Sequence, residues 1–346
     1  MANRDQSFTT IGENIHTTRV LLRRGKRIAQ AADGRESVRF KDRNRNNRYL
    51  PIPDSTKRTQ DYEEGRVKHV GIAVRTAMGD GVDAPVAHEY LATLVDRQEQ
   101  AGAHYLDLNV DEVSLKPEEQ QQAMTWLART VQTTGSTSLS IDSSNSDTIH
   151  IGLEAVDAEL SGQPLLNSAS LERIDVLNDA TYFNARVVVT AAGDSGMPTG
   201  SDERVHNASM IIEAALAKGI NDYDIFVDPL VFPISVDTDF GNHCLDAIRT
   251  IRSRFGPEIH ITGGFSNVSF GMPQRRLIND AFLLLAVQAG ADSGIVDPVT
   301  SRFATVLNMD LSSTRYRIAE DLLLGRDYRC KTFLRAHRQG ELDEGV

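Results

Sequence analysis

Polar side chains recur where the predicted strands of this 346-residue chain end. Asp107 and Asn109 close one apolar run, and Asp142 closes the next. The full set is Glu13, Asn14, Asp107, Asn109, Asp142, Asn167, Asp194 (in the loop after its strand), Asp228, Asn267 and Asp297. The set is rich in Asp and Asn and contains no histidine, cysteine or lysine. Because the carboxyl ends of barrel strands meet at one face, we expect these side chains to form a site.

The residue types in this set limit the chemistry of the site. A Schiff-base lysine, a cysteine nucleophile and a histidine-built metal site are all excluded at the strand ends. Carboxylates accept hydrogen bonds, and asparagine both accepts and donates them. The set therefore suits a neutral heterocycle with several N–H groups, such as a pterin with its exocyclic amine. Magnesium held by carboxylates alone is the alternative ligand for several of the same aspartates.

Each residue also has a purely structural interpretation. Asp142 and Asp228 could cap the helix or turn that follows them, and Asn167 could be a turn residue. Asp107 could lie inside a barrel and bind its neighbours. Asn267 is harder to explain in this way, because it sits in G-G-F-S-N-V-S-F-G with no apolar face to serve.

The elements that must position these residues alternate regularly. Strands are predicted at 7–12, 104–109, 137–142, 164–167, 186–190, 224–228, 259–262 and 293–297. Helical patterns lie between them, at 85–100, 116–134, 172–179, 202–219, 244–255 and 277–289. This predicts a (β/α)8 TIM barrel. An open doubly wound sheet is the competing fold, but it would place a G-x-G-x-x-G loop after its first strand, and none follows here.

Two segments depart from the alternation. We predict a helix at 16–31 and then a basic insertion at about 33–80, which follows the first strand and lacks sustained periodicity. Its arginines could bind a partner protein, an anionic substrate tail or a second subunit, or the segment could be a solvated arm. Those arginines are Arg35, Arg39, Arg43, Arg45 and Arg48. We also expect a helical extension at about 300–346, and one domain over 1–346.

Composition excludes several classes of protein. The net charge of −11 argues against general nucleic-acid binding. The chain shows no apolar run long enough to span a bilayer and no signal peptide at its start, so we expect a cytoplasmic protein. Cys244 and Cys330 are the two cysteines, which leaves a disulfide scaffold, a structural zinc and an iron–sulfur cluster without ligands.

The polar motifs together resemble the pterin-binding methyltransferases, a family that includes methyltetrahydrofolate:corrinoid protein methyltransferases and the folate domain of cobalamin-dependent methionine synthase. The resemblance covers about 9–298 and is carried by I-G-E-N-I-H-T-T-R (11–19), A-G-A-H-Y-L-D-L-N (101–109), S-I-D-S-S-N (140–145), L-N-S-A-S (166–170), D-S-G-M-P (194–198), F-V-D-P-L (226–230) and F-S-N-V-S-F-G-x-x-x-R-x-L-I-N (265–279).

The resemblance implies roles for individual residues. Asp142, Asn167 and Asp228 match residues that hydrogen-bond the pterin ring, and Asn267 matches the asparagine that reaches toward N5. Substrate contacts are also implied in the motifs that hold Asn109, Asp107, Ser266 and Arg275. The chain departs from the pattern at Phe270, where several relatives have glutamine, and at A-A-G-D (191–194). Both departures bear on substrate detail.

The implied reaction is methyl transfer between N5 of tetrahydrofolate and the cobalt of a corrinoid, in a direction that the motifs leave open. The sequence holds no D-x-H-x-x-G corrinoid motif, so a separate corrinoid protein is expected as partner. A homodimer is expected as well. The alternatives are a dihydropteroate-synthase-like condensing enzyme, which would carry a Gly-rich loop after the second strand, a non-catalytic pterin-binding protein, and a magnesium-dependent barrel lyase.

Overall fold

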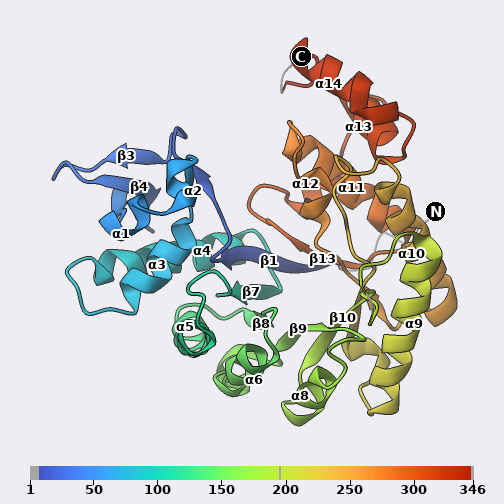
Figure 1. The fold of residues 1–346 in the computed structure, drawn as a ribbon, viewed down its shortest axis with the longest axis horizontal. Helices are drawn as coiled ribbons and strands as arrows, with labels where there is room; N and C mark the ends of the chain where they lie inside the picture. The colour runs from blue at the N-terminus through green and yellow to red at the C-terminus, as the bar shows by residue number, and fades with distance from the viewer. Residues whose placement is uncertain (1–7, 195, 344–346) are drawn as a thin grey trace. The chain divides into compact units, whose positions relative to one another are not determined.

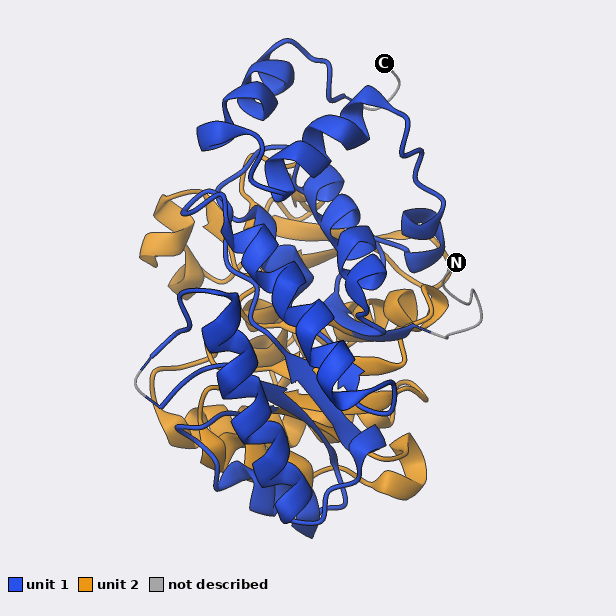
Figure 2. Cartoon of the chain, turned by 90° about the vertical axis from the view of Figure 1, so that its right-hand side faces the viewer, with its two compact units in different colours: residues 1–11, 168–346 blue, residues 12–167 orange. Residues whose placement is uncertain are grey.

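The computed structural model describes residues 8–194 and 196–343. The chain divides into two compact units, residues 1–11 with 168–346 (unit 1) and residues 12–167 (unit 2), which Figure 2 shows in two colours. The start of the predicted first strand at Ser7, position Ser195 of the D-S-G-M-P motif, and the last residues of the predicted extension, 344–346, lie outside the described residues.

Eight strands form one sheet in the order β12-β11-β10-β9-β8-β7-β1-β13. They are β1 (Thr9–His16), β7 (Tyr105–Asn109), β8 (Ser138–Asp142), β9 (Leu165–Ala169), β10 (Arg186–Thr190), β11 (Ile225–Asp228), β12 (His260–Ile261) and β13 (Ser293–Val296). A parallel bridge between Gly264 and Ile295 joins the segment after β12 to β13, the opposite end of the order. A strand order that returns on itself, with helices between the strands, confirms the predicted (β/α)8 fold class.

Strands β7 to β13 lie within two residues of the predicted ranges, whereas β1 runs four residues past the predicted end at Gly12. Burial explains the agreement. All five residues of β7 are buried, and so are the three valines of β10, Val187 to Val189. A parallel strand that is covered on both faces needs apolar or hydrogen-bonded side chains along its whole length, which leaves a recognisable run in the sequence.

Helices follow the strands along the chain (Figure 1). In unit 2 they are α3 (His69–Ala77), α4 (Ala84–Gln100), α5 (Pro117–Gln132), α6 (Ser146–Glu154) and α7 (Ala158–Ser161). In unit 1 they are α8 (Val176–Tyr182), α9 (Ser201–Ala217), η1 (Asp222–Asp224), α10 (Phe240–Phe255), η2 (Phe265–Ser269) and α11 (Arg275–Ala289). The helices predicted at 85–100, 116–134 and 202–219 correspond to α4, α5 and α9.

The segment after β1 is a small β-structure, so the helix predicted at 16–31 is wrong. β1 continues to His16, and β2 (Leu21–Leu22) pairs antiparallel with β6 (Arg66–Val67). An antiparallel three-stranded sheet follows, made of β3 (Ile28–Gln30), β4 (Glu36–Lys41) and β5 (Asn47–Pro51), with the short helices α1 (Asp54–Lys57) and α2 (Gln60–Glu63) after it.

Alternation along β4 and β5 explains why this sheet forms. Val38, Phe40 and Leu50 are buried, while Arg39 and Lys41 point outward. β5 contacts α4, so one face of the sheet is covered by that helix. The antiparallel pattern of one buried and one solvated face accounts for a segment that is basic and yet ordered.

Several arginines of this segment form ion pairs with the helix rather than projecting into solvent. Arg35 pairs with Asp83 at 2.7 Å, Arg43 with Asp96 at 2.6 Å and Arg48 with Glu89 at 2.8 Å. Each pair is exposed and contributes little alone, but together they connect the turns of the sheet to α4 and to its N-terminal end.

The C-terminal segment is helical, with α12 (Phe303–Leu307), α13 (Thr314–Leu323), η3 (Tyr328–Cys330) and α14 (Lys331–Arg338). α13 contacts α11. The end of α13 also lies against α10, where Asn242 Nδ2 donates to the Leu324 carbonyl at 2.7 Å. A Cβ at Gly241 would lie 2.1 Å from the Leu323 carbonyl oxygen, so glycine is required for this close approach. Cys244 and Cys330 are buried free thiols.

Candidate functional site

Three of the predicted site residues lie in register across neighbouring strands of unit 2. Asn109 on β7 pairs with Asp142 on β8, and Asp142 pairs with Asn167 on β9. Each closes or nearly closes its strand, and side chains in register on a parallel sheet point to the same face. The sequence prediction that Asn109, Asp142 and Asn167 share one edge is therefore met within this unit.

Asp107 lies one layer deeper on the same face of β7, because it is two residues before Asn109. Its side chain is fully buried. One carboxylate oxygen lies 2.8 Å from His16 Nε2, and Asn167 Nδ2 lies 3.4 Å from both oxygens. A carboxylate only accepts hydrogen bonds, so Asn167 must turn its NH2 group toward Asp107. Its Oδ1 then points away, as an acceptor.

Asn109 fixes Asp142 in a similar way. Asn109 Nδ2 donates to Asp142 Oδ2 at 2.9 Å, and Asn109 Oδ1 accepts the backbone N–H of Asp111 at 3.1 Å. Asp111 in turn accepts from Ser143 Oγ at 2.5 Å and from the backbone N–H of Ser144 at 2.8 Å. The loop after β7 and the loop after β8 thus hold both side chains in one orientation.

Two acceptor oxygens are left over by this arrangement. Among the residues that the structure describes, Asp142 Oδ1 and Asn167 Oδ1 have no hydrogen-bond partner, and neither is a fully buried atom. A ligand that satisfies both must offer donors. The cluster therefore selects a molecule with at least two N–H or O–H groups along one edge.

Burial and mutual repulsion set the protonation of the cluster. Burial and the nearby Asp107 carboxylate raise the pKa of Asp142 to about 7. Burial acts to lower the pKa of His16, but the hydrogen bond to Asp107 and the charges of Asp107, Asp142 and Glu13 outweigh it and leave that pKa raised. His16 is thus the cation that compensates two close carboxylates.

His16 corrects the prediction that no histidine lies at a strand end. Its imidazole and the carboxylates of Asp107 and Asp142 each bring one ligand atom within 4.8 Å of the others, a set that could hold a metal ion. His16 Nε2 already contacts Asp107 Oδ2 at 2.8 Å, and Asp142 Oδ2 already accepts from Asn109 Nδ2 at 2.9 Å. The hydrogen-bonded arrangement fits these contacts better, and the absence of a metal site stays a prediction.

Unit 1 places Asp228 at the carboxyl end of β11. The carboxylate is 8% exposed and accepts the backbone N–H groups of Leu230, at 2.7 Å, and of Gly264. Burial raises the pKa of Asp228 to about 6, against the lowering effect of those two donors. Leu230 has a φ of 67°, a left-handed conformation that is unfavourable for a leucine and that turns its N–H toward the carboxylate.

Asn267 lies beside the same glycine. It belongs to η2, and a Cβ added at Gly264 would lie 2.9 Å from Asn267 Nδ2. A Cβ at Gly263 would lie 3.4 Å from Asp228 Oδ1. Gly264 is thus what lets the amide of Asn267 approach this backbone turn, whereas the distance at Gly263 is ordinary van der Waals contact.

Ser266 and Arg275 brace the η2 turn. The Ser266 carbonyl accepts from Arg275 Nη2 at 3.1 Å, and Arg275 Nε donates to Ser269 Oγ at 2.9 Å. The Arg275 guanidinium also lies 4.7 Å from the centre of the Phe270 ring. These contacts support a positioning role for Arg275, while substrate contacts for Ser266 and Arg275 stay predictions.

Arg204 was not identified from the sequence. It lies on α9, is fully buried, and donates to the Leu230 and Gly200 carbonyls at 3.3 and 3.0 Å. Its guanidinium lies 4.7 Å from the Phe232 ring, and its Nη2 has no partner among the described residues. Burial lowers the pKa of Arg204, while Asp228 acts to raise it. Arg204 supports the loop that holds Asp228, and nothing in a helical sequence marks an arginine as inward-facing.

The other predicted strand-end residues have local roles. Glu13 pairs with Arg19 at 3.1 Å, and the backbone N–H of Asn14 donates to Gln98 Oε1 at 3.0 Å. Asp297 caps the turn after β13 by accepting the N–H groups of Val299 and Thr300. Asp194 is exposed.

Comparison with known proteins identifies a matching family and several relatives of similar sequence. The model of the pterin binding enzyme family matches residues 86–297. Methylcorrinoid:tetrahydrofolate methyltransferase of Eubacterium limosum is 32% identical over 253 residues, which cover 71% of this chain and 86% of that protein. Methionine synthase of Mycobacterium tuberculosis is 28% identical over 231 residues, which cover 62% of this chain and 19% of that protein.

Similar solved structures include dihydropteroate synthases. The enzyme of Xanthomonas albilineans in complex with 7,8-dihydropteroate has a TM-score of 0.52 at 18% identity, over 66% of this chain and 86% of that one. The enzyme of Stenotrophomonas maltophilia with active-site-bound imidazole has a TM-score of 0.52 at 17% identity, over 64% and 87%. At this identity the likeness is one of fold. In the described part of the chain, no helix is long and apolar enough to cross a bilayer.

Proposed function

Since the chain belongs to the pterin binding enzyme family, we propose that it transfers a methyl group between N5 of tetrahydrofolate and the cobalt of a corrinoid carried on a separate protein. The membership confirms the family resemblance drawn from the motifs. The observation that carries the proposal is the pair of acceptor oxygens on Asp142 and Asn167, which suits the donor-rich edge of a reduced pterin. The named reaction of the Eubacterium limosum relative supports the choice of methyl transfer.

Asp142, Asn167 and Asp228 are proposed to hold the pterin ring by its N–H groups. A ring held at several points loses its rotational freedom before the reaction, which is an orientation effect. The hydrogen bonds that fix Asp142 and Asn167 in the protein make those acceptors rigid before the ligand arrives. Asn109 and Asp107 act in this proposal by positioning Asp142 and Asn167.

Asn267 is proposed to act on N5. When the methyl group leaves N5, the nitrogen keeps the electron pair of the broken N–C bond, and a hydrogen bond or a proton must meet the negative charge that develops there. The Asn267 amide would stabilise the transition state more than the bound ground state, and solvent would supply the proton because an amide does not titrate. The cobalt of the corrinoid supplies the methyl-exchanging centre, and this chain supplies position.

The test is Asn267→Ala, assayed with tetrahydrofolate and methylcobalamin. Tetrahydrofolate affinity should be nearly unchanged, while turnover should fall by about 100-fold, the usual effect of removing one transition-state hydrogen bond. Equal losses in affinity and turnover would remove the transition-state role. Absence of methyl transfer in the wild type, with tetrahydrofolate still bound, would favour a non-catalytic pterin-binding protein.

Two further parts of the proposal have separate tests. Dihydropteroate-synthase-like condensation is the second candidate, because the solved structures of similar fold include that enzyme; consumption of p-aminobenzoate would reveal it. A homodimer and a corrinoid protein partner are expected from the family resemblance. Sedimentation of the chain alone, and then with the corrinoid protein, measures both.

A further inference from the structure

A hollow of about 510 Å³ in unit 2 is lined by Arg27 and by residues of β4, β5 and α4. Its basic lining residues are Arg27, Arg39, Lys41 and Arg97, and no carboxylate lines it. The hollow is made by side chains of the segment after β1 and of the helix that covers it. None of these residues belongs to the strand-end cluster.

Over the described ranges of the chain, these four basic side chains lack the carboxylate partners that nearby arginines have. Arg35, Arg43 and Arg48 each pair with a carboxylate at 2.6 to 2.8 Å. Within residues 8–194 and 196–343, no carboxylate lies within ion-pair distance of the basic residues of the hollow. In a chain of net charge −11, positive charges that gather without counter-charges create a local field for an anion.

Arg27 is held in a fixed position by a buried partner. Its Nη2 lies 2.7 Å from the hydroxyl oxygen of Tyr90, a residue with no exposed surface. Arginine only donates, so this oxygen accepts, and the Tyr90 O–H must donate to His69 Nδ1 at 2.8 Å. His69 can accept because burial lowers its pKa to about 3, which keeps the ring neutral. One end of the Arg27 fork is thus anchored, and its other donors are left for a ligand.

The floor of the hollow is apolar. Phe40 and Tyr90 meet edge to face with ring centres 4.9 Å apart, and Leu94 is 6% exposed. A volume of this size suits a small organic molecule better than a lone inorganic ion. The guanidinium groups suit the paired oxygens of phosphate or carboxylate groups.

We infer that this hollow binds a small organic polyanion with two or more phosphate or carboxylate groups on a carbon framework. The inference is independent of the proposed methyl transfer, because it uses other residues of the unit.

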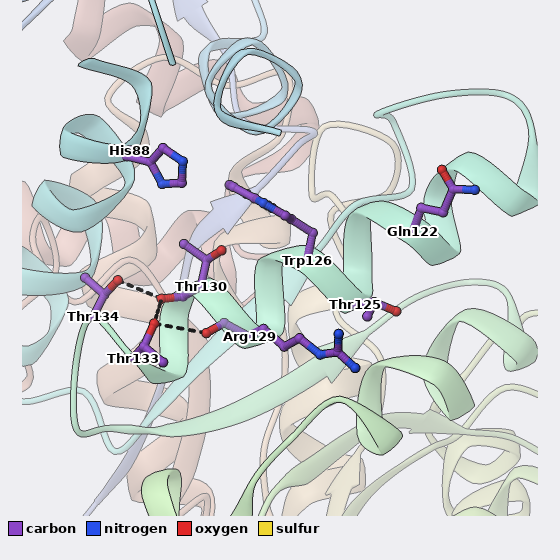
Figure 3. A pocket seen from close by; sticks show the side chains of 8 residues that line it. All are labelled: His88, Gln122, Thr125, Trp126, Arg129, Thr130, Thr133 and Thr134. Atoms are coloured by element: carbon purple, nitrogen blue, oxygen red, sulfur yellow. Dashed lines mark hydrogen bonds between the residues drawn. The ribbon is translucent and has the colours of Figure 1, made fainter. Parts of the chain in front are cut away.

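A second hollow of the same unit provides a matched control. It has a volume of about 590 Å³ and is lined by α4 and α5 side chains that include His88, Trp126 and the threonines of α5 (Figure 3). Arg129 is its only arginine or lysine. Arg129 is exposed on its helix, as Arg97 is, so Arg129→Gln removes a similar charge from a similar place outside the basic hollow.

The experiment is calorimetric titration of the whole chain with inorganic tripolyphosphate and, separately, with citrate. We expect one saturable site per chain, weakened by raising the salt concentration. Arg39→Gln combined with Arg97→Gln should weaken binding by at least tenfold, and both residues are exposed, so folding should survive. Arg129→Gln should leave the affinity unchanged.

The relative affinity of the two probes identifies the anionic groups of the ligand. Tighter binding of tripolyphosphate would indicate a ligand with phosphate groups, and tighter binding of citrate would indicate a ligand with carboxylates. No saturable binding of either probe by the wild type would overturn the inference. So would an equal loss in Arg129→Gln, since that would mean general attraction to basic surface, or an unchanged affinity in the double variant whose circular dichroism matches the wild type.

Discussion

Replacing His16 by glutamine should change the pH dependence of tetrahydrofolate binding. The imidazolium lowers the pKa of Asp142, which burial and Asp107 raise to about 7. A glutamine NH2 can still donate to Asp107, so the main loss is the positive charge. Without it, Asp142 should ionise at higher pH, and fewer molecules should present a carboxylate to the N–H groups of the pterin.

The size of the effect follows from the geometry. Charges 4.8 Å apart, the outer limit within this cluster, interact by about 3.5 kcal/mol at an effective dielectric constant of about 20. The His16 charge is shared with Asp107, which it contacts directly, so only part of this energy acts on Asp142. We therefore expect the pKa of Asp142 to rise by at least about one unit, or about 1.4 kcal/mol. At pH 7 the ionised fraction of Asp142 would fall from about one half to about one tenth. Affinity should therefore fall about fivefold at pH 7 and by less than about twofold at pH 9.

Anaerobic calorimetry with tetrahydrofolate from pH 6 to pH 9 measures this. The wild type should bind more tightly as pH rises through about 7, where Asp142 ionises. Asp142→Asn is the control, because an amide has no titration and should give a flat profile. A loss in His16→Gln that is equal at every pH would show that His16 acts by packing alone. A flat wild-type profile would show that the Asp142 carboxylate does not receive the ligand's N–H groups.

Two further predictions concern unit 1. Asp228→Asn should be stabilising at high pH: the folded-state pKa is raised to about 6, so the wild type loses stability as pH rises through that value. With an ordinary pKa of 3.8, the stability lost relative to Asp228→Asn between pH 4 and pH 8 is about 2.4 kcal/mol, which urea unfolding can measure. A pH-independent difference would contradict this prediction. Gly264→Ala should push the Asn267 amide aside, since the added Cβ would lie 2.9 Å from its nitrogen. Turnover should fall as in Asn267→Ala with tetrahydrofolate affinity kept, and Gly81→Ala, where the added Cβ meets nothing within 4 Å, should leave turnover unchanged.

The barrel strands could be predicted because strands that are buried on both faces consist of short, nearly continuous apolar runs. The strand predicted at 186–190 coincides with β10, and those at 104–109 and 137–142 start one residue early. Each is a short apolar run bounded by turn residues and preceded by a helical pattern, and no tertiary information is needed to see it.

The β3-β4-β5 sheet could not be read in the same way. Its buried residues alternate with arginine and lysine, as in V-R-F-K at 38–41. Because the segment carries so many charges, this two-residue repeat of apolar side chains was not recognised as a strand pattern. The alternation itself is visible, so it was a usable signal. The sequence does not reveal that Arg35, Arg43 and Arg48 pair with carboxylates on α4 and at its N-terminal end, which makes the basic segment part of unit 2.

Asp142 and Asn167 were predicted from the sequence as candidate acceptors, but His16 was not identified as the cation beside them. Strand ends with Asp and Asn are visible one by one, whereas His16 was assigned to a helix that does not exist. Successive side chains of a strand point to opposite faces, so extending β1 past Asn14 would have placed His16 on the same face of the strand as Asn14. Arg204 gave no such signal, because a charged residue on a helix is exposed far more often than buried.

The proposed mechanism gives the candidate residues separate tasks. In it, Asp142 and Asn167 of unit 2 supply acceptors to a donor-rich ring in the ground state, whereas Asn267 of unit 1 acts on the charge that develops on N5 during transfer. An enzyme cannot alter the equilibrium between its substrates and products, so loss of a transition-state contact must slow both directions by the same factor. Asn267→Ala should thus reduce kcat/KM equally whether the methyl group leaves N5 or arrives there. Under this proposal, the methylation state of the corrinoid and the supply of tetrahydrofolate set the direction of net transfer, because the same acceptors and the same Asn267 amide would act in both directions.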